Sequence, residues 1–283
     1  MTDRPTRDWL ALILTMVLPS FVTLTYFVLL RHQSAFVQQT AYAIGKTVQF
    51  AFPAFWVFVV LREGFIWNPP SPRGLVSGIG FGALVLVAAF ALYHGILQPR
   101  GIFDAATVSS PRFVQQAEEF AARGRVGPSG VARTEDREVS AEPREAGSSP
   151  AAAIRSKIRG LGVDRLWKFI ALGAFYAVFH SLLEEYYWRW FVFQRLRRLW
   201  PLTSAIGLSS IAFMAHHVIL MAVFFGWSSP WTYFFSLSVA VGGAVWAWLY
   251  ARSGSIYGPW LSHLLVDAAI FLIGYDLAKD LLV

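Results

Sequence analysis

The sequence contains no cysteine and few charged side chains. Only 14% of its 283 residues are Asp, Glu, Lys or Arg, whereas soluble domains carry about 25%. The absence of cysteine excludes a disulfide framework, a thiolate zinc site and a cysteine nucleophile. The scarcity of charge, with 56% hydrophobic residues, excludes a disordered chain and is unusual for a soluble enzyme. These values indicate a membrane protein.

Long apolar stretches make up most of the chain. A membrane-spanning helix needs about 20 predominantly apolar residues, and seven stretches meet this requirement: 9–30, 36–61, 75–97, 167–193, 204–225, 231–250 and 257–277. We therefore predict an all-α, polytopic transmembrane helical bundle of about seven spans. The protein is expected to be integral to a membrane, the cell membrane if the host is prokaryotic, with the lipid bilayer as its first partner.

One polar segment interrupts the apolar pattern. Residues 98–165 hold 11 of the 24 basic and 9 of the 17 acidic residues, and such a composition buries too little apolar surface to offset the entropy of ordering. We predict a largely disordered extramembrane linker over residues 98–166. It separates N-terminal transmembrane helices (1–97) from a C-terminal transmembrane domain (167–283).

Basic residues in the short loops predict the orientation. Lys and Arg are retained on the cytoplasmic side, and Arg195, Arg197 and Arg198 follow the fourth span. This places the N-terminus in the cytoplasm and the C-terminus outside. Because such loops explain the basic excess, no nucleic acid is expected as a partner, and nothing in the sequence indicates an oligomeric state.

Ionisable side chains inside the spans are concentrated in the C-terminal half. Each costs roughly 2.5–3.5 kcal/mol at mid-membrane, so such groups are usually functional. The first three spans hold only Lys46 and His94, which we interpret as a snorkelling or bundle-lining residue and an interfacial one. The fourth, fifth and last spans hold His180, Glu184, Glu185, Arg189, His216, His217, His263 and Asp267.

Helical spacing predicts partners among these groups. Glu185 and Arg189 are four residues apart and can form an ion pair, so Glu184, rotated by about 100°, points elsewhere. His263 and Asp267 have the same spacing.

Depth places three of these groups in one layer. At 1.5 Å per residue, Glu184 and His263 lie about 16 Å from the cytoplasmic side and His217 about 20 Å. A buried carboxylate beside imidazoles is suited to general acid–base chemistry. We interpret His180 and His216 as structural neighbours.

Three motifs in this order resemble the CPBP intramembrane proteases, which include the type II CAAX prenyl endopeptidases and bacterial relatives linked to bacteriocin processing. The family pattern is EExxxR, then FxxxH, then HxxxN or a close variant. Residues 184–189, 213–217 and 263–267 match these motifs, except that Asp267 replaces the usual Asn. The resemblance covers residues 165–280.

The resemblance implies an intramembrane endopeptidase that hydrolyses peptide bonds of membrane-associated peptides or protein tails. Glu184 would be the general base, His217 would help to hold the attacking water, and His263 and Asp267 would orient water or stabilise the oxyanion. An ionised Asp267 would keep His263 charged, whereas a protonated one would mimic Asn; we favour the ionised form. Supporting residues would be Glu185, Arg189 and Phe213.

The resemblance leaves a metalloprotease and a metal-free hydrolase open. A divalent metal such as zinc would be bound by Glu184, His217 and His263, although the HExxH signature is absent. Two other functions stand beside proteolysis. One is a catalytically silent membrane scaffold or immunity protein of the same family. The other is an ion-coupled transporter, which the lack of a matching motif in the first half disfavours.

Overall fold

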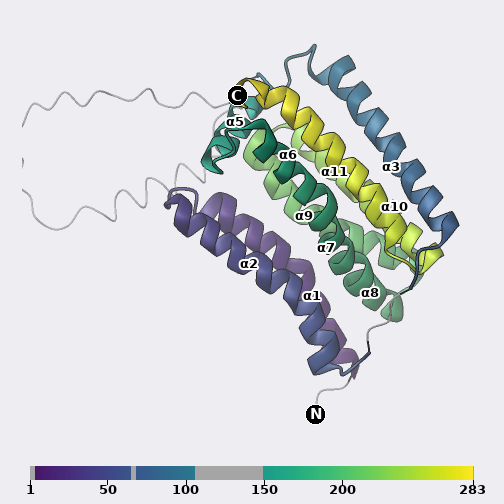
Figure 1. Ribbon diagram of the computed structural model, residues 1–283. Helices are drawn as coiled ribbons and strands as arrows, with labels where there is room; N and C mark the ends of the chain where they lie inside the picture. Colours follow the sequence, from purple (N-terminus) through teal and green to yellow (C-terminus); the bar gives the residue numbers. More distant parts are fainter. Residues whose placement is uncertain (1–3, 65–67, 106–148, 283) are drawn as a thin grey trace, which may run out of the picture.

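A computed structural model of the chain describes residues 4–64, 68–105 and 149–282, and all regular structure in these residues is helical (Figure 1). Seven helices are long and apolar enough to span a membrane, which confirms the predicted all-α polytopic bundle. They are Trp9–Leu29, Ala35–Val60, Pro72–Leu97, Leu166–Leu199, Leu202–Phe225, Pro230–Ser253 and Tyr257–Leu281.

Short π-helical stretches continue several of the α-helices. In the N-terminal part they extend α1 (Arg4–Leu24), α2 (Ala35–Phe55) and α3 (Pro72–Leu92) by Thr25–Leu29, Trp56–Val60 and Tyr93–Leu97. The C-terminal part contains α9 (Leu202–Phe225), α10 (Pro230–Ser253) and α11 (Tyr257–Ala278), which ends in the 3₁₀ turn Lys279–Leu281.

The fourth span is one long, irregular helix. It joins α6 (Leu166–Ala174), α7 (Ser181–Glu185) and α8 (Gln194–Leu199) through the π-helical stretches Phe175–His180 and Tyr186–Phe193. The span therefore runs to residue 199, beyond the end predicted at residue 193.

A short helix, α5 (Pro150–Gly160), lies within the segment expected to be a linker. Ser149 caps its N-terminus by accepting a hydrogen bond from the Ala152 amide, and Pro150 occupies the first turn. Ile158 packs in a small apolar cluster with the end of α11. Tertiary burial therefore favours a helix where composition alone indicates none. Residues 106–148 of the predicted linker lie outside the described residues.

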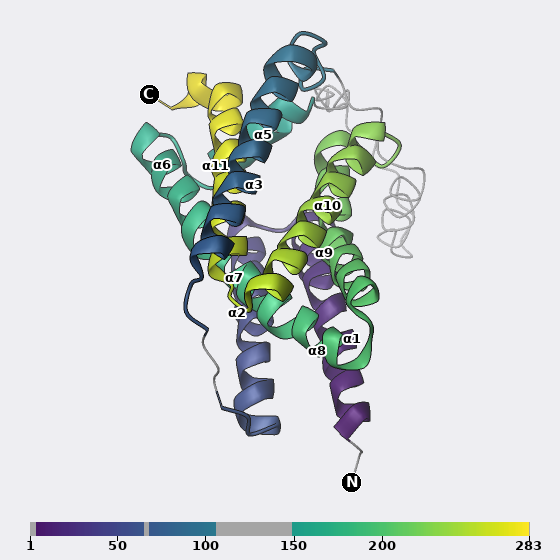
Figure 2. The same cartoon turned by 90° about the vertical axis from the view of Figure 1, so that its right-hand side faces the viewer.

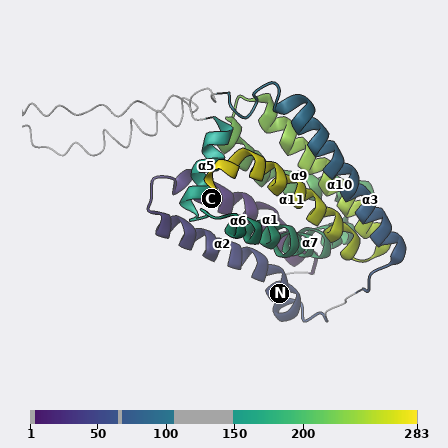
Figure 3. The ribbon, with the colours of Figure 1, turned by 45° about the horizontal axis from the view of Figure 1, so that its top comes forward.

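The spans pack as neighbouring pairs around an aromatic core. α3 lies along α11, and α10 lies along α9, while α1 packs between α9 and α2 (Figures 1 and 3). The largest fully buried side chains come mainly from the fourth span and α9, and include Tyr187, Trp188, Arg189, Phe191 and Phe213. The N-terminus and α8 lie at one end of the bundle and the C-terminus at the other (Figure 2). Which end faces the cytoplasm stays a prediction.

Loop contacts close the end that carries α8. The carboxylate of Glu63 forms ion pairs with Arg195 and Arg198 at 3.2 and 3.3 Å. Partial desolvation opposes the charge of Glu63, but the guanidinium groups of Arg198 and Arg195 outweigh it and hold its pKa below the usual value. Nearby, Asn68 donates a 2.7 Å hydrogen bond to the carbonyl of Gly254, whose φ of +66° ends α10. These contacts fix the loops after α2 and α10.

Small residues allow α3 and α11 to pack at backbone distance. A Cβ atom at Gly78 would overlap the backbone carbonyl of Gly258, and one at Gly82 would lie 2.9 Å from the Cα of Ser262. Small residues four apart permit close helix contact in membranes, where no hydrophobic effect drives helices together. α11 also carries His263, so this contact positions a predicted site residue.

We expect Gly78→Ala to destabilise the protein by about 1–3 kcal/mol, because the added methyl group forces α3 away from α11. The measurement is the midpoint of thermal unfolding in detergent. Gly80→Ala is the matched control, since no atom lies within 4 Å of a Cβ at that position on the same helix. Equal midpoints for the two variants would show that the close contact contributes nothing to stability.

Candidate active site

Helix α7 places two adjacent glutamates in the centre of the bundle. Glu184 and Glu185 are 3% and 0% exposed. π-helical stretches precede and follow this short α-helical segment, and such stretches are frequent at functional sites. Two buried carboxylates in a membrane span need partners from neighbouring helices.

Glu185 links its own helix to α11. Its Oε1 atom forms an ion pair with Arg189 Nη1 at 3.0 Å, so the contact expected from the spacing is present. The same oxygen accepts a 2.8 Å hydrogen bond from His263 Nδ1, a contact that the sequence did not predict. One carboxylate oxygen therefore holds a guanidinium group and an imidazole together.

The Arg189 side chain is enclosed by aromatic rings. Its guanidinium carbon lies 5.0 Å from the ring centres of both Phe213 and Trp246, and Nη2 donates a 3.3 Å hydrogen bond to the carbonyl of Gly243. Phe213, the first residue of the second motif, thus packs against the last residue of the first. This packing explains why both belong to one site.

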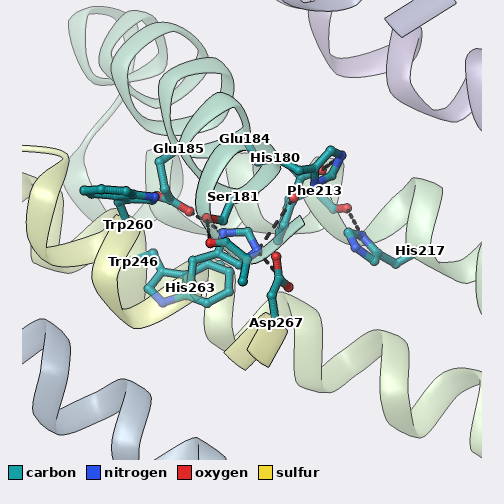
Figure 4. A network of polar contacts seen from close by, with 12 residues as sticks. His180, Ser181, Glu184, Glu185, Phe213, His217, Trp246, Trp260, His263 and Asp267 are labelled. Carbon is teal, nitrogen blue, oxygen red and sulfur yellow. Dashed lines mark hydrogen bonds and ion pairs between the residues drawn. The ribbon is translucent and has the colours of Figure 1, made fainter. Parts of the chain in front are cut away.

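Glu184 lies among three histidines from three different helical segments, two of which, His180 and His263, are labelled in Figure 4. Its Oε1 atom is 3.9 Å from His180 Nε2 and 3.9 Å from His216 Nε2, and Oε2 is 3.7 Å from His263 Nε2. We call Glu184, His180, His216 and His263 the Glu184 cluster. A carboxylate surrounded by imidazoles can exchange protons with a bound water or substrate.

His263 has a defined ring orientation. Because a carboxylate only accepts hydrogen bonds, Nδ1 carries the hydrogen that Glu185 accepts. The other nitrogen, Nε2, lies 3.7 Å from Glu184 and 3.7 Å from Asp267 Oδ1. The imidazole stacks on Trp246 with ring centres 4.1 Å apart, and the Trp246 indole donates a hydrogen bond to Ser262. The ring is therefore held on its face by Trp246 and at Nδ1 by Glu185.

The structure places His216, not His217, beside Glu184. His217 Nδ1 donates a 3.0 Å hydrogen bond to the carbonyl of Phe213, and its ring centre lies 4.1 Å from that of His216. Of the four predicted catalytic residues, Glu184, His263 and Asp267 are thus linked by contacts of 3.7 Å. His217 is separated from Glu184 by the ring of His216. Because its Nδ1 atom donates to Phe213, its Nε2 atom is a hydrogen-bond acceptor.

Sequence reasoning assigned no chemistry to His180 or His216, although each contacts Glu184. The spacing of four residues between His180 and Glu184 was an available signal, whereas nothing in the sequence shows that His216 faces the carboxylate. Asp267 and His180 each keep 17% of the side-chain surface exposed, while Glu184 is nearly enclosed. His180 and Asp267 are thus more exposed than the carboxylate that they flank.

The side chains proposed to bind a divalent metal do not form a ligand set. Among residues 4–64, 68–105 and 149–282, no three His, Asp or Glu side chains are arranged to hold a metal ion. Of the proposed ligands Glu184, His217 and His263, His217 donates to a backbone carbonyl, and His216 lies nearer to Glu184. We therefore derive no step through a metal.

We expect Arg189→Ala to act mainly through stability. Removing the guanidinium group strands Glu185, which is fully buried, at a cost of about 3–5 kcal/mol. The midpoint of thermal unfolding and the amount of protein in the membrane should both fall. Arg197→Ala is the control, because Arg197 is an exposed arginine of the same span, and it should leave both quantities unchanged. The double variant Glu185→Gln with Arg189→Gln removes both charges and should recover part of the stability that Arg189→Ala loses. If it recovers none, the loss does not come from an unpaired buried charge.

Comparisons with known proteins agree with the motifs. A family model described as type II CAAX prenyl endopeptidase Rce1-like matches residues 166–269, a region that contains all three motifs and every residue of the Glu184 cluster. A search of curated proteins found no similar chain, and a search of solved structures found none either. The resemblance to the CPBP intramembrane proteases is therefore confirmed over residues 166–269.

Proposed function

We propose that this protein is an intramembrane endopeptidase that cuts peptide bonds of membrane-associated peptides or protein tails. The observation that carries the proposal is the Glu184 carboxylate, which lies within 4 Å of three imidazoles inside a region similar to prenyl endopeptidases. Such a carboxylate in a low-dielectric interior is suited to act as a general base.

The proposed reaction is the addition of water to a peptide carbonyl. Glu184 takes one proton from the water, and the resulting hydroxide attacks the carbonyl carbon. The tetrahedral intermediate then collapses as Glu184 passes that proton to the leaving amine. The products are a carboxylic acid and an amine, which ionise to a carboxylate and an ammonium group, so the step consumes one water and leaves Glu184 unchanged.

In this proposal, His263 stabilises the negative charge that develops on the carbonyl oxygen. Its Nε2 atom faces Glu184 and Asp267 at 3.7 Å, while Glu185 holds Nδ1. An imidazolium fixed in this way provides a preorganised donor for an oxyanion. His217 donates a hydrogen bond from Nδ1 to the Phe213 carbonyl, so its Nε2 atom is an acceptor. In the proposed reaction this atom orients the attacking water.

Glu184→Gln should abolish proteolysis and leave the protein folded and inserted. The amide keeps the shape of the side chain but cannot take a proton, and general-base catalysis contributes about 10²–10⁴-fold. The measurement is cleavage of a membrane-peptide library by purified protein, with and without a chelator, which also tests metal dependence. Asp104→Asn, which removes an exposed carboxylate outside the Glu184 cluster, is the control. Retention of more than about a tenth of the activity would exclude this role for Glu184.

Asp267→Asn tests whether Asp267 acts through its charge. A neighbouring carboxylate favours the protonated imidazole, so its removal should reduce cleavage and move the alkaline limb of the pH–rate profile to lower pH. Asp280→Asn is the control, because it makes the same change at an exposed position in the 3₁₀ turn after α11. An unaltered profile would mean that Asp267 serves only as a substitute for the amide found in relatives.

A further inference from the structure

Lys46 is a cation in the middle of a membrane span. It is the twelfth residue of the span Ala35–Val60 on α2, and no other Lys or Arg lies well inside the first three spans. Charged groups at this depth are unfavourable unless they are paired or functional. The question is what balances the Lys46 ammonium group.

The Lys46 ammonium group lies between two aromatic rings of its own helix. Lys46 Nζ lies 5.7 Å from the ring centre of Tyr42 and 5.3 Å from that of Phe50, one turn before and one turn after it. A snorkelling lysine extends toward the membrane surface, away from one of these rings. Contact with both rings keeps Lys46 Nζ between neighbouring turns of its own helix, which favours the bundle-lining interpretation over snorkelling.

The ammonium group keeps its hydrogen-bond donors free. A lysine has three N–H donors and no acceptor. Within the described part of the chain, Lys46 forms neither an ion pair within 4.0 Å nor a hydrogen bond, and its contacts are with the two rings. Aromatic faces attract a cation but accept only weakly, so the group is held in place without being neutralised.

Lys46 faces the Glu184 cluster. The ring of Phe50 lies 6.0 Å from that of His180, and His180 Nε2 is 3.9 Å from Glu184. The ammonium group is also within electrostatic range of Glu184 and of His216. Lys46 therefore lies on the side of the cluster that His180 occupies.

The other full cation near the cluster is already paired. Arg189 is bound to Glu185 at 3.0 Å and enclosed by rings. Lys46 is therefore the cation on this side of the cluster that can accept a new anion. A carboxylate on a substrate would satisfy its donors in a medium of low dielectric, where such a pair is strong.

We propose that Lys46 is a specificity-determining residue that binds a carboxylate of the substrate beside the Glu184 cluster. The carboxylate comes either from an acidic side chain near the cut bond or from the free C-terminus of the peptide. The inference rests on the proposed endopeptidase function and adds a preference for anionic substrates.

The test compares substrates that differ only in one carboxylate. Two pairs of membrane peptides are used, one with Asp or Asn near the cut bond and one with a free or an amidated C-terminus. The wild type should cleave the anionic member of one pair with a kcat/KM about tenfold or more above that of its neutral counterpart, as expected for a charge-assisted hydrogen bond. The pair that shows the difference identifies the source of the carboxylate.

Variants assign this preference to Lys46. Lys46→Met should bring the ratio of the two kcat/KM values near one, through loss on the anionic peptide alone, and Lys46→Arg should retain the ratio. Lys157→Met is the matched control. Lys157 belongs to α5, and its Nζ atom also lies over aromatic rings, 4.0 Å from the ring centre of Tyr26 and 5.1 Å from that of Phe27. Thermal unfolding of each variant verifies folding.

The outcomes separate this inference from the proposed function. If the wild type cleaves neither member of any pair, the endopeptidase proposal fails. If it cleaves both members equally, or if Lys46→Met keeps the wild-type ratio, the endopeptidase proposal stands and the role of Lys46 is refuted.

Discussion

The site depends on one carboxylate oxygen. Glu185 Oε1 lies 3.0 Å from Arg189 on the same helix and 2.8 Å from His263 on α11, in surroundings where its side chain is fully buried. This shared contact sets the register between the fourth span and α11. The register in turn places His263 Nε2 opposite Glu184. A buried charge with two partners restricts its helices far more than apolar packing does, because loss of either partner leaves a charge unpaired in low dielectric.

The seven spanning helices were predictable because crossing a bilayer requires long apolar runs, and this requirement is visible in composition alone. The pairing of the helices was not. The contact of α3 with α11 depends on backbone approach at Gly78 and Gly258, and glycines at this spacing are also common in spans that face lipid. The π-helical stretches around α7 likewise leave no trace in hydropathy, since one extra residue in a turn changes side-chain direction and not composition.

The sequence predicted which ionisable residues share a helix face and a depth in the membrane, but not their exact partners. Spacing of four residues identified the Glu185–Arg189 pair, and depth brought Glu184 near His263. The choice between His216 and His217 was beyond such reasoning. Adjacent residues on a helix differ by about 100° in direction, and the rotation of α9 is decided by side-chain packing across the bundle. Phe213 shows how: its ring lies against Arg189, and its carbonyl binds His217, which leaves His216 toward Glu184.

Aromatic rings accompany the ionisable groups wherever these lie deep in the bundle. Arg189 lies between Phe213 and Trp246, His263 stacks on Trp246, His216 stacks parallel to Trp188, and Lys46 lies between Tyr42 and Phe50. Rings supply an electron-rich face to a cation while keeping the site free of competing hydrogen-bond acceptors. The polar groups are thus held in place and remain weakly solvated, so each charge responds strongly to the next. A further charge brought in by a substrate would change the electrostatics of the whole Glu184 cluster, so the side chains next to that charge affect what can react there.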